Sequence, residues 1–148
     1  MSVFFCENIN FNFDYNFFII NFNLQLNLNL MKESILKTKS FSFAIDSINL
    51  YKKLKEQEEY VISKQLLRSG TSIGANIREA NNAQSPSDFI HKLYISQKEC
   101  DESIYWLEFL KVTNYINENE FSDLNFKSNE ILKMLKSSIL TTKEKLKK

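Results

Sequence analysis

Apolar residues recur every three or four positions along most of the chain after residue 30. This spacing places them on one face of a helix, and it is found in four separate stretches. The stretches are residues 32–55 (Phe41, Ala44, Ile45, Ile48, Tyr51, Leu54), 58–82 (Ile62, Leu66, Ser69, Ile73, Ile77, Ala80), 86–115 (Phe89, Leu93, Ser96, Cys100, Ser103, Leu107, Leu110) and 121–147 (Leu132, Leu135, Ile139, Thr142, Leu146). Four helices joined by short loops predict an all-α protein, an antiparallel up-down-up-down four-helix bundle.

Start and stop signals separate these stretches. Ser85 precedes Pro86 and is followed three residues later by Asp88, which predicts an N-cap, a proline at the first helical position and a variant capping box. A short Asn-rich turn is expected at residues 117–119. The chain has one proline and two glycines, too few for a loop-rich or all-β protein.

The first 30 residues have a different pattern, in which asparagine nearly alternates with phenylalanine and leucine. Alternation of period two is typical of a strand, and such tracts are prone to aggregate. The segment lacks the basic start and cleavage site of a signal peptide, and its asparagines interrupt any membrane span. We expect residues 1–30 to be a non-globular, low-complexity extension and Met31 to be the natural start. The alternative is a genuine extension that is disordered or adds a strand to a partner. N-terminal sequencing distinguishes the two.

Both glycines, Gly70 and Gly74, lie within the second helical stretch among small residues. A glycine inside a helix costs about 1 kcal/mol relative to alanine. We therefore expect another helix to pack closely against this one. The alternative is a phosphate-binding loop, but the lysine and preceding strand of a P-loop are missing.

The third helical stretch carries apolar residues on more than one face. The stripe led by Phe89 is expected in the core, whereas a second set lies toward the back of the helix, where a monomer would be charged. This pattern predicts self-association, and the interface residues expected are Ile90, Tyr94, Tyr105, Trp106 and Phe109. The alternative is that these rings lie singly at the surface.

The charges nearly balance, with 19 basic and 18 acidic residues, far from the strongly basic character of a dedicated nucleic-acid binder. Cys6 and Cys100 form no disulfide framework, which favours a reduced, cytoplasmic setting. Four cations are candidate phosphate contacts, with surface charge and salt bridges (Lys92 with Asp88) as the alternative. They are Lys64, Arg68, Arg78 and Lys92.

No arrangement of side chains predicts catalysis, a cofactor or a metal. His91 and Cys100 are half a turn out of phase on one helix and point apart. Glu99, Asp101 and Glu102 lack the Glu-x-x-His partner of di-iron bundles and are expected to be solvated charge. Cys100 falls in the core stripe and is expected to be inert.

Two segments resemble the four-helix-bundle proteins of the 23S ribosomal RNA intervening-sequence family. They are SKQLLRSGTSIGANIREA (residues 63–80) and AQSPSDFIHKLYISQKECDESIYWLEFL (residues 83–110). The resemblance implies a bacterial protein whose left-handed bundle assembles into a homopentameric ring. A related branch serves diversity-generating retroelements, where a basic pentamer associates with a reverse transcriptase and nucleic acid. The present chain is less basic than that branch.

These observations lead to one main hypothesis and two alternatives. The main hypothesis is a non-catalytic oligomeric scaffold or adaptor linked to ribosomal RNA intervening sequences or mobile elements, with weak RNA contact and no membrane contact. A pure protein-interaction module, without nucleic-acid contact but gripping a partner such as a nucleic-acid-processing protein, is the first alternative. An enzyme that acquires a metal or cofactor is the second.

Overall fold

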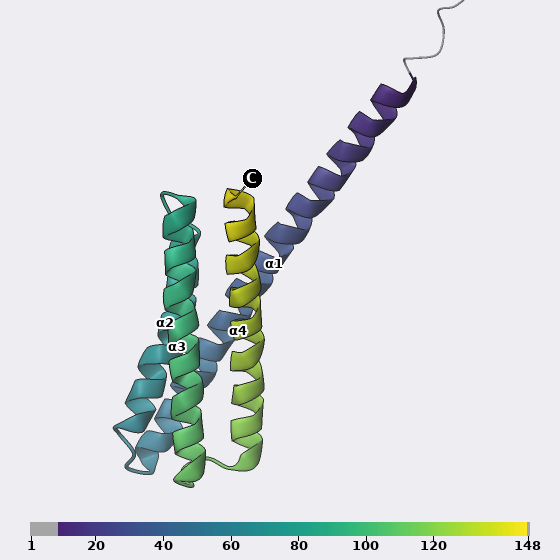
Figure 1. Ribbon diagram of the computed structural model, residues 1–148. Coiled ribbons are helices and arrows are strands. Elements are labelled where there is room, and N and C mark those ends of the chain that lie inside the picture. Colours follow the sequence, from purple (N-terminus) through teal and green to yellow (C-terminus); the bar gives the residue numbers. More distant parts are fainter. Residues whose placement is uncertain (1–8, 148) are drawn as a thin grey trace, which may run out of the picture. The chain divides into compact units, whose positions relative to one another are not determined.

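The computed structural model describes residues 9–147, and these form α-helices joined by short loops (Figure 1). The helices are α1 (Ile9–Glu56), α2 (Ile62–Ala80), α3 (Pro86–Val112) and α4 (Glu118–Leu146). Within this described part no strand is present. The chain divides into two compact units, Met1–Ser34 and Ile35–Lys148. The predicted all-α fold class is confirmed.

The N-terminal unit is helical from Ile9 onward, so residues 9–30 do not form the strand that their period-two pattern is typical of; residues 1–8, with Cys6, lie outside the described part. A helix satisfies its backbone hydrogen bonds locally, whereas a strand needs a neighbouring strand. Alternation of period two spreads apolar residues around the whole helix. Accordingly the large apolar side chains described here are exposed: Phe17, Phe18, Ile19, Ile20, Phe22, Leu24, Leu26, Leu28, Leu30 and Met31.

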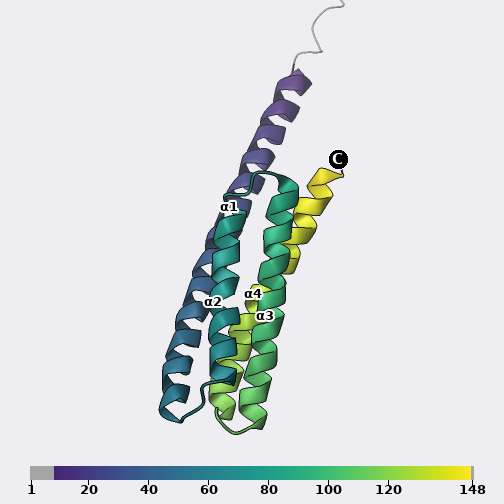
Figure 2. The same cartoon turned by 90° about the vertical axis from the view of Figure 1, so that its left-hand side faces the viewer.

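The second unit is a four-helix bundle in which neighbouring helices run antiparallel (Figure 2). The contacts between neighbouring helices show that they are antiparallel, because residue numbers rise along one helix as they fall along its neighbour. The contacts are Ser47–Gly70 and Ser40–Gly74 for α1 and α2, Ser96–Ile73 and Ser103–Ser69 for α2 and α3, Tyr94–Lys143 and Cys100–Ser128 for α3 and α4, and Lys39–Glu130 and Asp46–Lys127 for α1 and α4. These contacts place α1 beside α2 and α4, and α3 beside α2 and α4, which is consistent with the predicted bundle.

The buried stripes of α2 and α3 are close to those predicted. In α2 the stripe includes Leu66, Ser69, Ile73, Ile77 and Ala80, and in α3 it includes Leu93, Ser96, Cys100, Ser103, Leu107 and Leu110. In α4 the prediction was correct for Leu132, Leu135 and Ile139, but Leu146 is exposed. The stripe of α4 instead starts earlier, at Leu124.

The buried stripe of α1 differs from the prediction. The core takes Leu36, Ser40, Phe43, Ser47, Leu50 and Leu54, whereas Phe41 and Ile45 are 53% and 43% exposed. The reason is the close approach of α2. Gly70 lies against Ser47 and Gly74 against Ser40, so the fold buries the stripe of α1 that carries small side chains rather than the more apolar one.

Gly70 is the point of closest approach between α1 and α2. A Cβ atom at Gly70 would lie 2.9 Å from Ser47 Cβ and closer still to Ser47 Oγ, whereas one at Gly74 would lie 3.5 Å from Ser40 Oγ. At Gly70 the helix that approaches closely is α1, whereas at Gly74 the contact with α1 is an ordinary van der Waals contact. Both glycines lie inside α2, which excludes the phosphate-loop alternative.

The helix ends combine expected and unexpected caps. Ser85 Oγ accepts a hydrogen bond from the Asp88 N–H at 3.1 Å, as predicted, although the Asp88 carboxylate accepts from Gln84 rather than from Ser85. Asn117 forms a full capping box with Glu120. The predicted turn at residues 117–119 is therefore already the start of α4, and the turn itself lies just before it.

The N-terminus of α2 is capped by a glutamate that the sequence analysis did not identify. Glu59 is 5% exposed as a residue, and its carboxylate accepts hydrogen bonds from the backbone N–H groups of Val61 (3.0 Å), Ile62 (2.7 Å) and Ser63 (2.6 Å). Burial alone raises the pKa of Glu59, but the hydrogen bonds to the charged form outweigh it and leave the pKa below its ordinary value.

The loop before this cap contains a strained residue, which gives a first prediction. Glu58 lies just after the end of α1 and has a φ of 62°. The N–H groups of Glu58 and Glu59 donate to the Lys55 and Leu54 carbonyls, respectively, which is the Schellman pattern. Because glycine adopts this conformation without a Cβ penalty, we expect Glu58→Gly to raise the free energy of unfolding by about 0.5–1 kcal/mol in urea denaturation.

Asn114, with φ of 61° at the end of α3, provides the matched control. Asparagine tolerates this conformation better than glutamate, so Asn114→Gly should give a smaller gain. A loss of stability in Glu58→Gly would show that the Glu58 side chain matters more than its backbone strain.

Candidate interaction surface

The outward side of α3 carries the aromatic residues expected at an interface, with one correction. Tyr94, Tyr105 and Phe109 are 38%, 49% and 43% exposed, whereas Ile90 is 9% exposed and belongs to the core. Ile90 directly follows Phe89, which the sequence pattern placed in the core. At the start of α3 it is Ile90 that enters the core, whereas Phe89 is only partly buried against it. Ile90 is therefore not available at the surface of a single chain.

Three rings form a contiguous cluster on α3, which we call the aromatic surface: Tyr105, Trp106 and Phe109. The Tyr105 and Trp106 ring centroids are 4.8 Å apart in an edge-to-face arrangement, and Tyr105 and Phe109 are 5.4 Å apart. Trp106 is partly buried against the core, so it anchors the two exposed rings. Aromatic rings favour such edge-to-face and tilted arrangements, and the three rings together form one contiguous cluster.

Trp106 is oriented by a polar network that reaches α2. Its indole Nε1–H donates to Glu102 Oε1 at 3.1 Å, and the same carboxylate oxygen accepts from the Arg68 guanidinium. Arg68 Nη1 also lies 3.6 Å from Glu99 Oε2. The expectation that Glu99 and Glu102 are merely solvated charge was wrong, because both face Arg68.

The network shifts the pKa values of its members in opposite directions. Burial raises the pKa of Glu99, and Arg68 offsets only part of this effect. Burial also raises the pKa of Glu102, but the hydrogen bonds from Trp106 and Arg68 outweigh this effect and leave the pKa below its ordinary value. Glu102 is therefore firmly ionised at neutral pH and holds Arg68 to the α2–α3 boundary.

The four cations nominated as phosphate contacts do not form one patch of free charge. Arg68 is engaged as described, and Lys92 forms an ion pair at 2.6 Å with Glu79 on α2 rather than with Asp88. Arg78 stacks over the Phe41 ring at 5.2 Å. In the described part of the chain, Lys64 is exposed without an ion-pair partner. Two of the four cations are therefore neutralised within the chain.

Cys100 and His91 are kept apart, as predicted. Cys100 is fully buried and its Sγ–H donates to the Ser128 carbonyl at 3.1 Å, whereas His91 is exposed. Burial raises the pKa of the Cys100 thiol to about 12, so the thiol stays protonated and is a poor nucleophile. Cys100 has a packing role.

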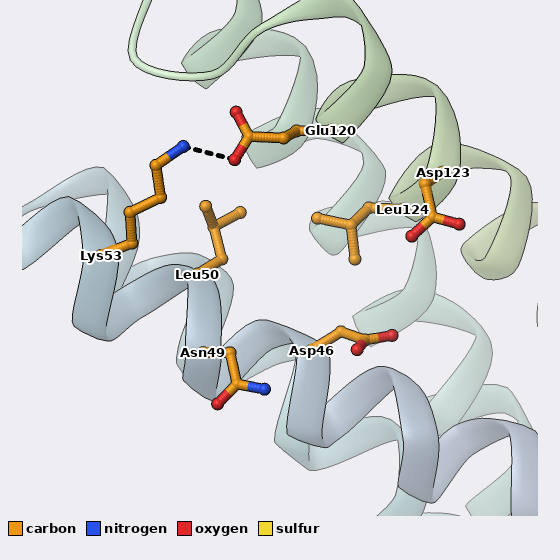
Figure 3. A pocket seen from close by; sticks show the side chains of 7 residues that line it. All are labelled: Asp46, Asn49, Leu50, Lys53, Glu120, Asp123 and Leu124. Atoms are coloured by element: carbon orange, nitrogen blue, oxygen red, sulfur yellow. Dashed lines mark hydrogen bonds and ion pairs between the residues drawn. The ribbon is translucent and has the colours of Figure 1, made fainter.

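A shallow groove between α1 and α4 gathers three carboxylates, but lysines pair with all of them. The groove encloses about 250 Å³ and is lined by Asp46, Asn49, Leu50, Lys53, Glu120, Asp123 and Leu124. Figure 3 shows Lys53 of α1 reaching Glu120 of α4 across it. Lys127 bonds to Asp46 at 3.0 Å and Asp123 at 2.7 Å. Among the described residues no group of His, Cys, Asp or Glu could hold a metal ion. The groove is a seam between helices.

Over residues 9–147, no helix combines the length and the apolar character needed to cross a bilayer.

By class, the fold and surface define an antiparallel helical-bundle protein with an outward-facing aromatic surface. The family of 23S rRNA-intervening sequence proteins matches residues 32–137, and the chain belongs to this family, as its sequence resemblance indicated. A protein of unknown function from the S23 ribosomal protein family of Bacteroides thetaiotaomicron VPI-5482 has a similar crystal structure. It is 55% identical, with a TM-score of 0.72, over 73% of this chain and 97% of that chain. The comparison with curated proteins gives no match.

Proposed function

We propose that this protein is a non-catalytic scaffold that assembles with copies of itself through the aromatic surface of α3. The observation that carries the proposal is the exposure of Tyr105 and Phe109 beside the anchored Trp106. Aromatic residues are enriched in the cores of protein interfaces, where they contribute a large share of the binding energy. The family resemblance, which implies a ring of five chains, supports the same assembly.

Direct RNA contact would use the cations that carry no ion pair within the described part of the chain. Lys64 and Arg78 are available to phosphates, whereas Arg68 and Lys92 are held in ion pairs. A nucleic acid would have to displace Glu102 and Glu79 to use them. A symmetric assembly would repeat Lys64 around its axis and strengthen its field. We therefore propose a scaffold first, with RNA as a salt-sensitive additional partner.

The assembly is tested by measuring the mass of the full chain by light scattering after size exclusion. We expect a particle of about five chains, and we expect Tyr105→Asp/Phe109→Asp to reduce it to one chain, because two charges would be desolvated in the contact. Unchanged circular dichroism would show that the helices persist. An unchanged mass in the double variant would contradict the proposal, and nucleic acid in the wild-type peak, lost at high salt, would support RNA contact.

A further inference from the structure

The surface of α1 carries a second apolar stripe that the core leaves uncovered. Phe41 and Ile45 are 53% and 43% exposed, although the sequence pattern predicted both for the core. They lie one turn apart, so they form a continuous strip. The bundle therefore presents two apolar surfaces, one on α1 and one on α3.

The strip on α1 is flanked by cations. The Arg78 guanidinium of α2 lies over the Phe41 ring at 5.2 Å, and Lys37 precedes Phe41 by one turn of α1. Within residues 9–147 neither cation takes part in an ion pair. We call Lys37, Phe41, Ile45 and Arg78 the α1–α2 patch.

The aromatic surface of α3 is flanked by the opposite charge. Asp101 lies one turn before Tyr105 and Glu108 one turn after it, and both are exposed. Neither carboxylate belongs to an ion pair of the described residues. Each surface thus combines exposed apolar side chains with unpaired charges, and the two surfaces carry opposite signs.

We infer that the α1–α2 patch of one copy receives the aromatic surface of a second copy. This inference rests on the proposed function and names the other half of its interface. Opposite charges flanking the two apolar surfaces favour this pairing, because pairing the aromatic surface with itself would bring Asp101 and Glu108 of both copies together. Contact between two different surfaces is heterologous and leaves one free surface of each kind at the ends, until a ring closes.

The test uses two variants that each disable one surface. The first is Tyr105→Asp/Phe109→Asp, and the second is Phe41→Asp/Ile45→Asp. Each alone should have the mass of a single chain, because it lacks one half of the contact. Mixed in equal amounts at rising concentration, they should form a particle of about twice that mass, which cannot grow further. Sedimentation velocity measures all three samples.

Phe126→Asp provides the matched control, because Phe126 is a ring on α4 that is 64% exposed and belongs to neither surface. We expect it to keep the wild-type mass. The inference is overturned if Phe41→Asp/Ile45→Asp also keeps the wild-type mass, since the α3 surface would then pair with something else. If instead both double variants keep that mass, the proposed function itself fails.

Discussion

Replacing Gly70 by alanine is expected to lower the free energy of unfolding by about 1–3 kcal/mol. The added Cβ would lie 2.9 Å from Ser47 Cβ and 3.4 Å from Phe43 Cε1, inside the closest contact between α1 and α2. Rotating the Ser47 hydroxyl relieves only part of the overlap, because its Cβ is fixed to the backbone. Alanine is better than glycine in a helix by about 1 kcal/mol, so a net loss shows that the overlap dominates. Chemical denaturation monitored by circular dichroism measures the difference.

Gly74→Ala is the control for this result, because it makes the same chemical change one turn further along α2. Its Cβ would meet Ser40 at 3.5–3.7 Å, which is ordinary van der Waals contact. This variant should be neutral or more stable by up to about 1 kcal/mol. Adding Ser47→Gly to Gly70→Ala should recover part of the lost stability, since the opposing side chain is removed. Equal effects at the two glycines would argue against a close contact at Gly70.

Replacing Glu59 by alanine should also destabilise the bundle strongly, by about 2 kcal/mol at neutral pH. The change leaves three backbone N–H groups at the start of α2 without their acceptor. It also removes a negative charge from the positive end of the helix dipole. Glu59→Gln keeps one acceptor oxygen but no charge, so its loss should be smaller. The measurement is urea denaturation of the three proteins side by side.

The Glu59 effect should depend on pH in a defined direction. The folded-state pKa of Glu59 lies below its ordinary value of 4.5. The stabilisation is therefore fully present above pH 4.5 and is lost as the pH falls through the folded-state pKa. Comparing wild type with Glu59→Gln removes the contribution of other carboxylates. A difference that is constant from neutral pH down to about pH 3 would mean that the charge of Glu59 has no part in capping.

The sequence predicted the stripes of α2 and α3 because leucine and isoleucine there recur with small residues in one dominant register. It failed for α1, where Phe41 and Ile45 are more apolar than Ser40 and Ser47 but the latter are buried. The apolar pattern of one helix contains no information about its neighbours. It therefore does not show that Gly70 on α2 requires a small side chain opposite it on α1. The period-two pattern of residues 9–30 misled for a similar reason, because it says nothing about whether a partner strand exists.

The candidate site shows the same division between local and long-range information. The exposed rings of Tyr105 and Phe109 follow from their position on α3 relative to the core stripe. The pairing of Lys92 with Glu79 and of Arg68 with Glu102 joins different helices, so only the folded bundle reveals it. Glu59 left only a weak local signal, an acidic residue just before the apolar run of α2, because Ser, Thr, Asp and Asn are the residues that usually cap a helix.

The seam between α1 and α4 joins the two ends of the bundle sequence. Its lysine–carboxylate bridges, Lys39–Glu130, Asp46–Lys127 and Lys53–Glu120, connect residues that are 91, 81 and 67 positions apart. On the ribosome, α1 and α2 can therefore pair as a hairpin early, while the flank of α1 that faces α4 stays uncovered until the last helix has emerged. Chain closure is slowest for such distant contacts. Until then the Leu50 side of α1, which lines the seam with α4, stays exposed on the nascent chain.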